Sequence, residues 1–143
     1  MKIRNMTIDD IPAVREIGDN APELSVTEDN TAFWDADRLT GWIEANQDVM
    51  LVAEDDGEVV GFQITQIHQP SKIGYLSDLA VKERARGNGI GSQLVKLTLE
   101  KMREMGVTYV YTLTQVKNDK IHNLLKKYNF DQCEKMIWFE ARL

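Results

Sequence analysis

The central part of the chain has the alternation of apolar and polar residues that predicts β-strands. In Val59–Ile67, apolar side chains recur at every second position, as in a strand with one buried face. The turn sequence Asp55-Asp56-Gly57 separates this range from the apolar Val49–Glu54, so the two ranges predict a hairpin. Ile73–Val81 predicts a third strand beside them.

Both flanks of this central part have helical spacing instead. Capping residues at Thr7–Asp10, with Pro12 near the first turn, predict a helix that runs to about Asp19. Apolar residues three and four positions apart follow Ile90, and Gly106 ends that helix. Two more helices are expected, at about Phe33–Ala45 and Asn118–Asn129.

Three further short strands complete the predicted fold. They are expected at Met1–Met6, Val107–Thr114 and Met136–Ala141. The resulting order, βααβββαβαβ, predicts an α+β fold in which helices cover the faces of one sheet. A chain of 143 residues has the size of one domain, so residues 1–143 are expected to form a single domain.

Charge is unevenly distributed along the chain. The net charge is −6, with acidic residues in excess up to Gly57 and basic residues in excess from Glu58 on. Either the acidic helices are simply solvated, or a basic half binds a polyanion while an acidic half attracts a cation. The acidic balance argues against nucleic acid as a partner.

Cellular location and metal content are also constrained by composition. No run of 18 apolar residues is present to predict a membrane span, and Met1–Pro12 lacks the features of a signal peptide. A single cysteine, Cys133, fits a reducing compartment and a structural role, so we expect a cytoplasmic protein. His68 and His122 do not lie at metal-ligand spacing with Cys133, so no metal is expected.

The most informative stretch runs from Leu79 to Leu94. A strand ends, a glycine-rich turn follows, and an amphipathic helix begins at once. The free N–H groups and the positive dipole end of such a helix favour phosphate binding. Glycines at 87, 89 and 91 let the backbone approach a pyrophosphate, and Arg86 and Arg84 would add charge-assisted hydrogen bonds.

Other interpretations of this turn fit less well. A plain strand-to-helix connection would not need the basic flank. A P-loop would continue with Gly-Lys-Ser/Thr, which this turn lacks. A dinucleotide site needs the third glycine one position later and an acidic residue near the end of the next strand, and residues 106–114 contain no acid.

At this turn the chain resembles the GNAT acetyltransferase superfamily. The signature Arg/Gln-x-x-Gly-x-Gly/Ala is met by Arg86, Gly89 and Gly91, and the frame from Asp78 to Leu94 also matches. The family's second helix motif is roughly Asn-x-x-Ala-x-x-Leu-Tyr-x-x-x-Gly-Phe. It aligns with residues 118–130, where the matching residues are Asn118, Leu124 and Phe130.

The resemblance implies a mixed, mostly antiparallel sheet of six to seven strands with about four helices, splayed where acetyl-CoA binds as cosubstrate. Backbone groups of Leu79 and Val81 would bond the pantetheine arm, and Asn118 would support it. Lys127 or Lys126 could reach the ribose phosphate. The implied cofactor-binding residues are Leu79, Ala80, Val81, Arg84, Arg86, Gly87, Asn88, Gly89, Ile90, Gly91, Ser92, Asn118, Leu124 and Lys127.

The chain departs from the family at Leu125, where many members have a tyrosine that protonates the departing thiolate. A thiol titrates near ~8.5, so the reaction would be slowed rather than stopped. Tyr128 and His122 are candidate replacements for this tyrosine. The alternative is that Tyr128 is an amphipathic residue that caps the core and that His122 is a surface histidine. Asn129 replaces a glycine at the helix end, where asparagine also accepts the left-handed conformation.

The attacking amine must lose a proton, because alkylamines titrate near ~10. Asp78 is the carboxylate nearest the expected reaction centre and is either that base, directly or through water, or an ordinary acid at the sheet edge. His68 is a weaker candidate base. The three candidate catalytic residues are therefore Asp78, Tyr128 and His122.

In the family, the first two helices and their loop shape the acceptor pocket. Here that segment combines carboxylates with aromatic side chains, which suits an organic ammonium ion. The carboxylates are Asp19, Glu23, Glu28, Asp29, Asp35 and Asp37, and the aromatic residues are Phe33, Trp34 and Trp42. Alternatively, Trp34 and Trp42 pack in the core of the helices and do not contact the acceptor.

Three functions are compatible with these residues. The first is direct acetyl transfer, in a ternary complex, from acetyl-CoA to a small cationic amine. The second is acetylation of a protein N-terminus or lysine. The third is a CoA-binding regulatory module with weak catalysis, which Leu125 favours. Dimers are common in the family, so a homodimer is compatible with the resemblance.

Overall fold

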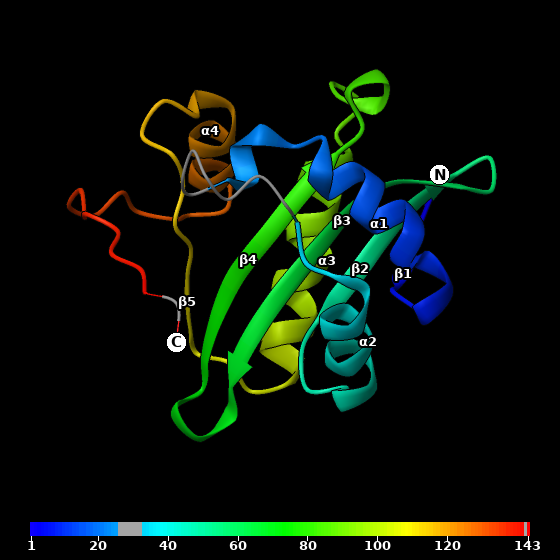
Figure 1. Ribbon diagram of the computed structural model, residues 1–143. Helices are drawn as coiled ribbons and strands as arrows, with labels where there is room; N and C mark the ends of the chain where they lie inside the picture. Colours follow the sequence, from blue (N-terminus) through cyan, green and yellow to red (C-terminus); the bar gives the residue numbers. More distant parts are fainter. Residues whose placement is uncertain (26–32, 142) are drawn as a thin grey trace.

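The computed structural model describes residues 1–25, 33–141 and 143, and a mixed sheet lies at its centre. The first four strands pair antiparallel, and the fifth runs parallel to the fourth. Figure 1 shows the strands side by side in chain order. They are β1 (Lys2–Asn5), β2 (Met50–Asp55), β3 (Glu58–His68), β4 (Ile73–Val81) and β5 (Tyr109–Tyr111).

Helices cover both faces of this sheet (Figure 1). Helices α1 (Ile11–Asp19) and α2 (Ala36–Ala45) lie on one face, and α3 (Ile90–Glu104) lies on the other. Helix α4 (Asp119–Lys127) lies beyond the sheet, near the end of β4. Short 3-10 turns occur at Ile8–Asp10, Pro22–Leu24, Gln69–Ser71 and Glu83–Ala85.

Each face of the sheet carries its own hydrophobic core. Val14, Leu39 and Phe62 are fully buried between the sheet and helices α1 and α2. Leu51 and Leu94 are fully buried on the α3 side. Burial of each such side chain stabilises the fold by roughly 1.5–3 kcal/mol, so both helix layers are held firmly against the sheet.

The number of strands was predicted too high. Within the described residues the sheet has five strands, not six to seven. The predicted strand Val107–Thr114 pairs only over Tyr109–Tyr111, and Met136–Ala141 forms no strand. Met136 and Phe139 are 83% and 88% exposed. A strand needs a neighbour as well as a suitable pattern, and this segment has none in the structure.

The splay predicted for the sheet is present between β4 and β5. Their parallel pairing ends at Tyr75 and Tyr111, although β4 continues to Val81. Thr112 Oγ1 donates a hydrogen bond to the carbonyl of Leu76 (2.8 Å), and the chain then moves away toward α4. Within the described residues, the edge of β4 beyond Leu76 is therefore left without a neighbouring strand on the β5 side.

Other local predictions are also confirmed. The hairpin between β2 and β3 is present, and Asn129 has the predicted left-handed backbone, with φ at 61°. Glu28 and Asp29 lie outside the described residues, as does the second half of the loop predicted for Ala21–Asn30. None of the helices in residues 1–25, 33–141 and 143 has both the length and the apolar character needed to cross a membrane.

Candidate active site

The free edge of β4 presents backbone groups to the splay. Lys82 N–H donates to the carbonyl of Val60 (2.8 Å), which fixes the alternation of hydrogen-bonded pairs between β3 and β4. By that alternation, Ala80 bonds toward β3, whereas the N–H and C=O groups of Leu79 and Val81 point into the opening. An extended amide-containing chain could therefore bind there as an added strand.

The glycine-rich loop lies at the end of this edge. Gly87 and Gly89 have left-handed φ angles of 83° and 76°, which favour glycine, and a Cβ on either would project into open space. The first bond of α3 runs from Gln93 N–H to the carbonyl of Gly89 (3.0 Å). The preceding N–H groups, of Ile90, Gly91 and Ser92, therefore have no intrahelical acceptor and are available to an anion.

The basic side chains near this loop differ in where they point. Lys127 Nζ donates to Ser92 Oγ (2.9 Å), which places a positive charge at the start of α3. Arg86 donates to the carbonyl of Val81 (2.8 Å) and forms an ion pair with Glu23 (2.9 Å). Both contacts hold the Arg86 guanidinium at the mouth of the splay, on the side of the predicted acceptor segment.

Arg84 is directed away from the splay. It pairs with Glu58 at the β2–β3 hairpin, and Lys82 donates to the same carboxylate (2.7 Å). These hydrogen bonds, first from Lys82 and then from Arg84, lower the pKa of Glu58 to about 2. Of the predicted basic ligands, Lys127 thus lies at the helix start, Arg86 at the end of β4, and Arg84 against the β2–β3 hairpin.

Helix α4 packs against the first turn of α3. Leu124 lies close to Gly91, with its Cδ2 atom 3.7 Å from the position a Cβ would take. Asn118 caps α4 by accepting from Ile121 N–H (3.3 Å). Leu125 is buried in the core on the α3 side, so the position of the family's tyrosine is occupied by a packing residue.

The two candidate proton donors make hydrogen bonds within the protein. The Tyr128 hydroxyl donates to the carbonyl of Ser92 (2.7 Å) and lies 2.8 Å from Ser92 Oγ. His122 Nε2 lies 2.8 Å from Thr114 Oγ1. Tyr128 is thereby held at the first turn of α3 and His122 beside the segment that follows β5, and their catalytic roles stay predictions.

Asp78 lies on the sheet face that carries α1 and α2. Asp78 is 8% exposed, and its carboxylate accepts hydrogen bonds from Ser77 Oγ (2.5 Å) and Trp34 Nε1 (3.2 Å). Burial raises the pKa of Asp78 above its usual range, and the two hydrogen bonds oppose this only in part. Asp78 is therefore a better proton acceptor near neutral pH than an exposed aspartate would be.

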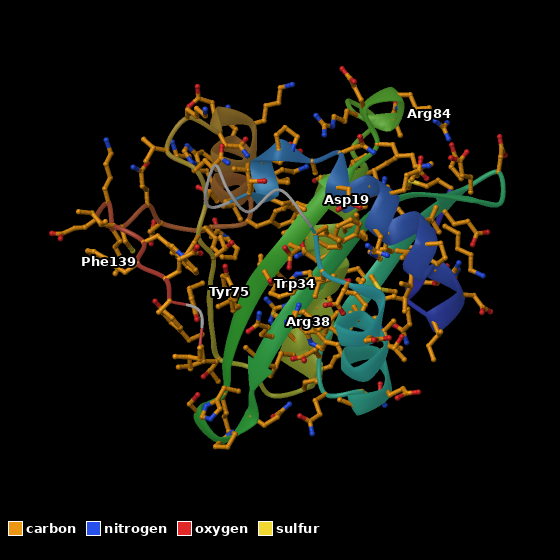
Figure 2. All side chains as sticks on the ribbon, viewed as in Figure 1. Asp19, Trp34, Arg38, Tyr75, Arg84 and Phe139 are labelled. Carbon is orange, nitrogen blue, oxygen red and sulfur yellow. The ribbon has the colours of Figure 1, made fainter. Side chains whose placement is uncertain are left out.

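A cavity of about 500 Å³ lies on the same face of the sheet. Trp34 and Trp42 meet edge to face, with ring centroids 5.8 Å apart, and Tyr75 stacks on Tyr111 at 4.9 Å. Figure 2 shows Trp34 over β3 and β4, and Tyr75 on β4. The lining is completed by Asp48, Gln66, Ile67, His68 and Ile73.

The walls of this cavity are fixed by hydrogen bonds. Asp48 accepts from Trp42 Nε1 (2.6 Å) and from the N–H of Ile67 (2.5 Å). The indole N–H of Trp34 is bonded to Asp78. Both tryptophans thus have their polar atoms satisfied and present their ring carbons to the cavity, beside buried or half-buried carboxylates.

Sequence reasoning found part of this site. It identified Asp78, Trp34 and Trp42, which the structure brings together on one face. It missed Tyr75 and Tyr111 as cavity residues, because their meeting depends on the β4–β5 register. In the described part of the chain, no three His, Cys, Asp or Glu side chains are grouped to hold a metal ion.

Comparison with known proteins places this geometry in a family. An N-alpha-acetyltransferase of Sulfurisphaera tokodaii is 28% identical over 98% of this chain and 86% of its own length. A ribosomal-protein-alanine N-acetyltransferase of Brucella melitensis, 28% identical, superposes with a TM-score of 0.82 over 94% of this chain and 86% of its own.

A further structure of the same fold was solved with acetyl-CoA. The Salmonella typhimurium protein yncA, in complex with its cofactor acetyl-CoA, shares the fold with a TM-score of 0.78 at 23% identity, over 91% of this chain and 79% of its own. Residues 14–130 match the acetyltransferase (GNAT) family. The chain therefore belongs to the GNAT family and is an acetyl-CoA-dependent N-acetyltransferase.

Proposed function

We propose that this enzyme acetylates a primary amine that enters through the aromatic cavity and is deprotonated by Asp78 beside the free edge of β4. The observation that carries the proposal is the position of Asp78. Its carboxylate is buried next to the cavity lined by Trp34 and Tyr75, while its neighbour Leu79 directs backbone groups into the splay. The amine would therefore lie on the face of β4 and acetyl-CoA along its edge, with only the β4 backbone between them.

The residues on the splay side fit acetyl-CoA. The edge groups of Leu79 and Val81 suit the amides of the pantetheine arm, and the open N–H groups at the start of α3 suit the pyrophosphate. Lys127 adds a cation at that helix end. When bound, acetyl-CoA supplies an acetyl thioester that an amine can attack directly.

Asp78 would take the proton from the incoming ammonium group. A free alkylamine titrates near ~10, so most of it is protonated at neutral pH and cannot attack. A carboxylate whose pKa is raised by burial is better matched to this step, and such a base contributes roughly 10²–10⁴-fold to rate. Ser77 and Trp34 orient the carboxylate through their hydrogen bonds.

The departing thiolate needs less assistance. A thiol titrates near ~8.5, so thiolate is a tolerable leaving group at neutral pH. Leu125 offers no proton, and Tyr128 is the phenol nearest to the first turn of α3 through its bonds to Ser92. We propose Tyr128 as the proton donor and His122 as the alternative.

The cavity favours a cationic acceptor. Tryptophan and tyrosine rings attract ammonium ions through their faces. Asp48 in the lining adds negative charge, and so does Asp78, which accepts a hydrogen bond from the lining residue Trp34. A small diamine or polyamine could place one ammonium between the rings while its other end reaches Asp78. We therefore propose a small cationic amine as the first acceptor class.

A peptide N-terminus is the second candidate. The Sulfurisphaera tokodaii relative, matched over nearly the whole chain, is an N-alpha-acetyltransferase, and the Brucella melitensis relative is a ribosomal-protein-alanine N-acetyltransferase. Exposed Tyr109 and Leu113 continue from the cavity along β5 and the residues after it, where a peptide backbone could lie. A peptide acceptor would use the same base and the same cofactor edge.

Thiol release from acetyl-CoA tests the choice between these acceptors. The panel consists of polyamines, aminoglycosides, and peptides with alanine, serine or methionine N-termini, each also tested with the N-terminus blocked. Release that depends on a polyamine or aminoglycoside supports the first class, and release with free but not blocked peptides supports the second. Acetyl-CoA binding without release on any amine would contradict the catalytic role of Asp78.

A further inference from the structure

The pairing of β3 with β4 contains a bulge next to Asp78. Ile64 pairs with Asp78 and Thr65 pairs with Leu76, so Ser77 has no partner on β3. An extra residue of this kind reverses the alternation of side chains along the strand. Leu76 consequently packs in the α3-side core, whereas Asp78 lies on the opposite face, near Tyr75.

Without the bulge, Asp78 could not act where the cavity lies. Side chains at positions 76, 78 and 80 of a regular strand share one face. Here Leu76 belongs to the α3-side core and Ala80 to the core beneath α1 and α2. The extra residue is therefore what brings the carboxylate of Asp78 to the indole of Trp34.

One buried side chain ties the two strands together at this bulge. Gln63 is 1% exposed, and its Nε2 atom lies 3.0 Å from the carbonyl of Ile64 and 3.1 Å from the carbonyl of Asp78. Both partners are acceptors, so the nitrogen of the side-chain amide must face them. Gln63 thus crosslinks the main chain of Asp78 to that of its partner residue on β3.

We propose that Gln63 is a positioning residue for the reaction: its side-chain amide holds the β4 bulge and so fixes the direction of the Asp78 carboxylate. This inference rests on the proposed function, in which Asp78 is the base. Gln63 itself touches neither substrate. Its pairing with Leu79, and the contacts of Leu79 with the α3-side core, place it on the side of the sheet away from the cavity.

Two features of the site argue for glutamine in particular. Gln63 Oε1 has no hydrogen-bond partner among the described residues, and a buried unpaired acceptor lowers stability. An apolar side chain of similar size would avoid that cost but would donate nothing to the two carbonyls. Glutamate would place an acceptor against acceptors, so the two-donor requirement at the bulge selects the amide.

Thr65 supplies a matched control on the same strand. It is fully buried two residues further on, and its hydroxyl bonds both the N–H and the carbonyl of Val49 at 2.9 Å. Like Gln63, it crosslinks β3 to a neighbouring segment through backbone groups, but its hydroxyl bonds Val49 and makes no contact with the main chain of Asp78. Thr65→Val should therefore cost stability in the same way without moving the carboxylate.

The test compares Gln63→Met, Gln63→Asn and Thr65→Val in the full chain. Gln63→Met should lower kcat/KM for the amine roughly 10-fold to 100-fold, as expected when a catalytic group is misplaced. Affinity for acetyl-CoA should stay near that of the wild type. Gln63→Asn keeps the amide on a shorter side chain, so its kcat/KM should lie between those of the wild type and Gln63→Met. This variant also serves as the test if Gln63→Met does not fold.

Direct titration of the Asp78 carboxyl separates this inference from the proposed function. Carbon-13 NMR of protein with labelled aspartate follows this carboxyl, and the signal that is missing in Asp78→Asn identifies it. The titrating groups that line the cavity, and from which its titration must be distinguished, are Asp48, His68, Tyr75 and Tyr111. In Gln63→Met the carboxyl gains solvent, so its pKa should fall toward the ordinary value; in Thr65→Val it should not move.

Each outcome either supports or contradicts the positioning role of Gln63. A lowered Asp78 pKa and a selective loss of kcat/KM in Gln63→Met support the positioning role. If Asp78→Asn keeps full kcat/KM, the proposed base is wrong, and the carboxyl titration still decides whether Gln63 positions Asp78. An Asp78 titration and a kcat/KM in Gln63→Met equal to those of Thr65→Val would overturn the inference.

Discussion

The edge and the face of β4 contribute to the site in different ways. At the edge, backbone groups of Leu79 and Val81 and the loop from Gly87 to Gly91 offer N–H and C=O groups whose positions depend on a short, continuous segment. On the face, Asp78 meets Trp34 from a distant part of the chain. Backbone recognition can be encoded locally, whereas a side-chain constellation needs the whole fold.

This difference predicts that the two functions can be damaged separately. Changes on the face should reduce turnover of the amine and leave acetyl-CoA affinity intact. Changes in the loop should reduce acetyl-CoA affinity and leave the ionisation of Asp78 unchanged. The variants below are ordered from the largest expected effect to the smallest.

Asp78→Asn should have the largest effect. The amide keeps the shape and the bond from Trp34 but cannot accept the proton of an ammonium group, so kcat/KM for the amine should fall roughly 10²–10⁴-fold. Calorimetric titration should give an unchanged Kd for acetyl-CoA. A large loss of acetyl-CoA affinity in this variant would show that the face and the edge are not separate.

Gly89→Ala tests the loop. A Cβ there would sit on a left-handed residue and project into the open space where we place the pyrophosphate. Acetyl-CoA affinity should weaken about tenfold, which corresponds to ~1.4 kcal/mol.

Gly106→Ala is the control for that variant. Gly106 has a similar φ of 85° but follows the other end of α3. Each substitution should cost roughly 1–2 kcal/mol of stability for the left-handed conformation, measured by urea unfolding. Equal effects of the two variants on acetyl-CoA affinity would argue against binding at the loop.

Trp34→Phe tests the hydrogen bond between the indole of Trp34 and Asp78. It removes the indole N–H that donates to Asp78 but keeps an aromatic ring at the cavity. The lost bond stabilised the charged carboxylate, so the pKa of Asp78 should rise further and kcat/KM at neutral pH should fall about tenfold. Trp42→Phe, which loses an equivalent bond to Asp48, should leave the Asp78 titration in place.

Glu23→Gln should have the smallest effect and the opposite sign. Glu23 pairs with Arg86 at the mouth of the splay, and this pair competes with an anionic ligand for the guanidinium. Acetyl-CoA should bind about two- to threefold more tightly at low salt, as expected for a partly exposed ion pair.

The gain from Glu23→Gln should shrink as salt is added. Glu16→Gln removes the same charge from an ion pair with Lys82 and serves as the control. Equal gains in the two variants would indicate a general change of charge rather than release of Arg86.

The edge could be predicted from the sequence because its determinants are close together. The glycine-rich loop and the start of α3 follow from residues 86–94 alone. The left-handed end of α4 at Asn129 was likewise predicted from one residue and its neighbours. Such features depend on the backbone conformations that a few neighbouring residues favour, so a short stretch of sequence is enough to predict them.

The face could be predicted only in part. Asp78 and Trp34 were identified as candidates, but the bulge at Ser77 depends on how β4 pairs with β3. Tyr75 meets Tyr111 because of the β4–β5 register, which no local pattern encodes. The strand expected at Met136–Ala141 was wrong for a related reason, since an apolar segment does not specify a partner.

The dependence of kcat/KM on pH, in wild type and in Asp78→Asn, tests the central claim most directly. Burial raises the pKa of Asp78, so wild-type kcat/KM should be low where the carboxyl is protonated and should rise with pH through a value above the usual aspartate range. In Asp78→Asn that rise should disappear and the remaining rate should be low. An unchanged rise in Asp78→Asn would contradict the assignment of Asp78 as the base.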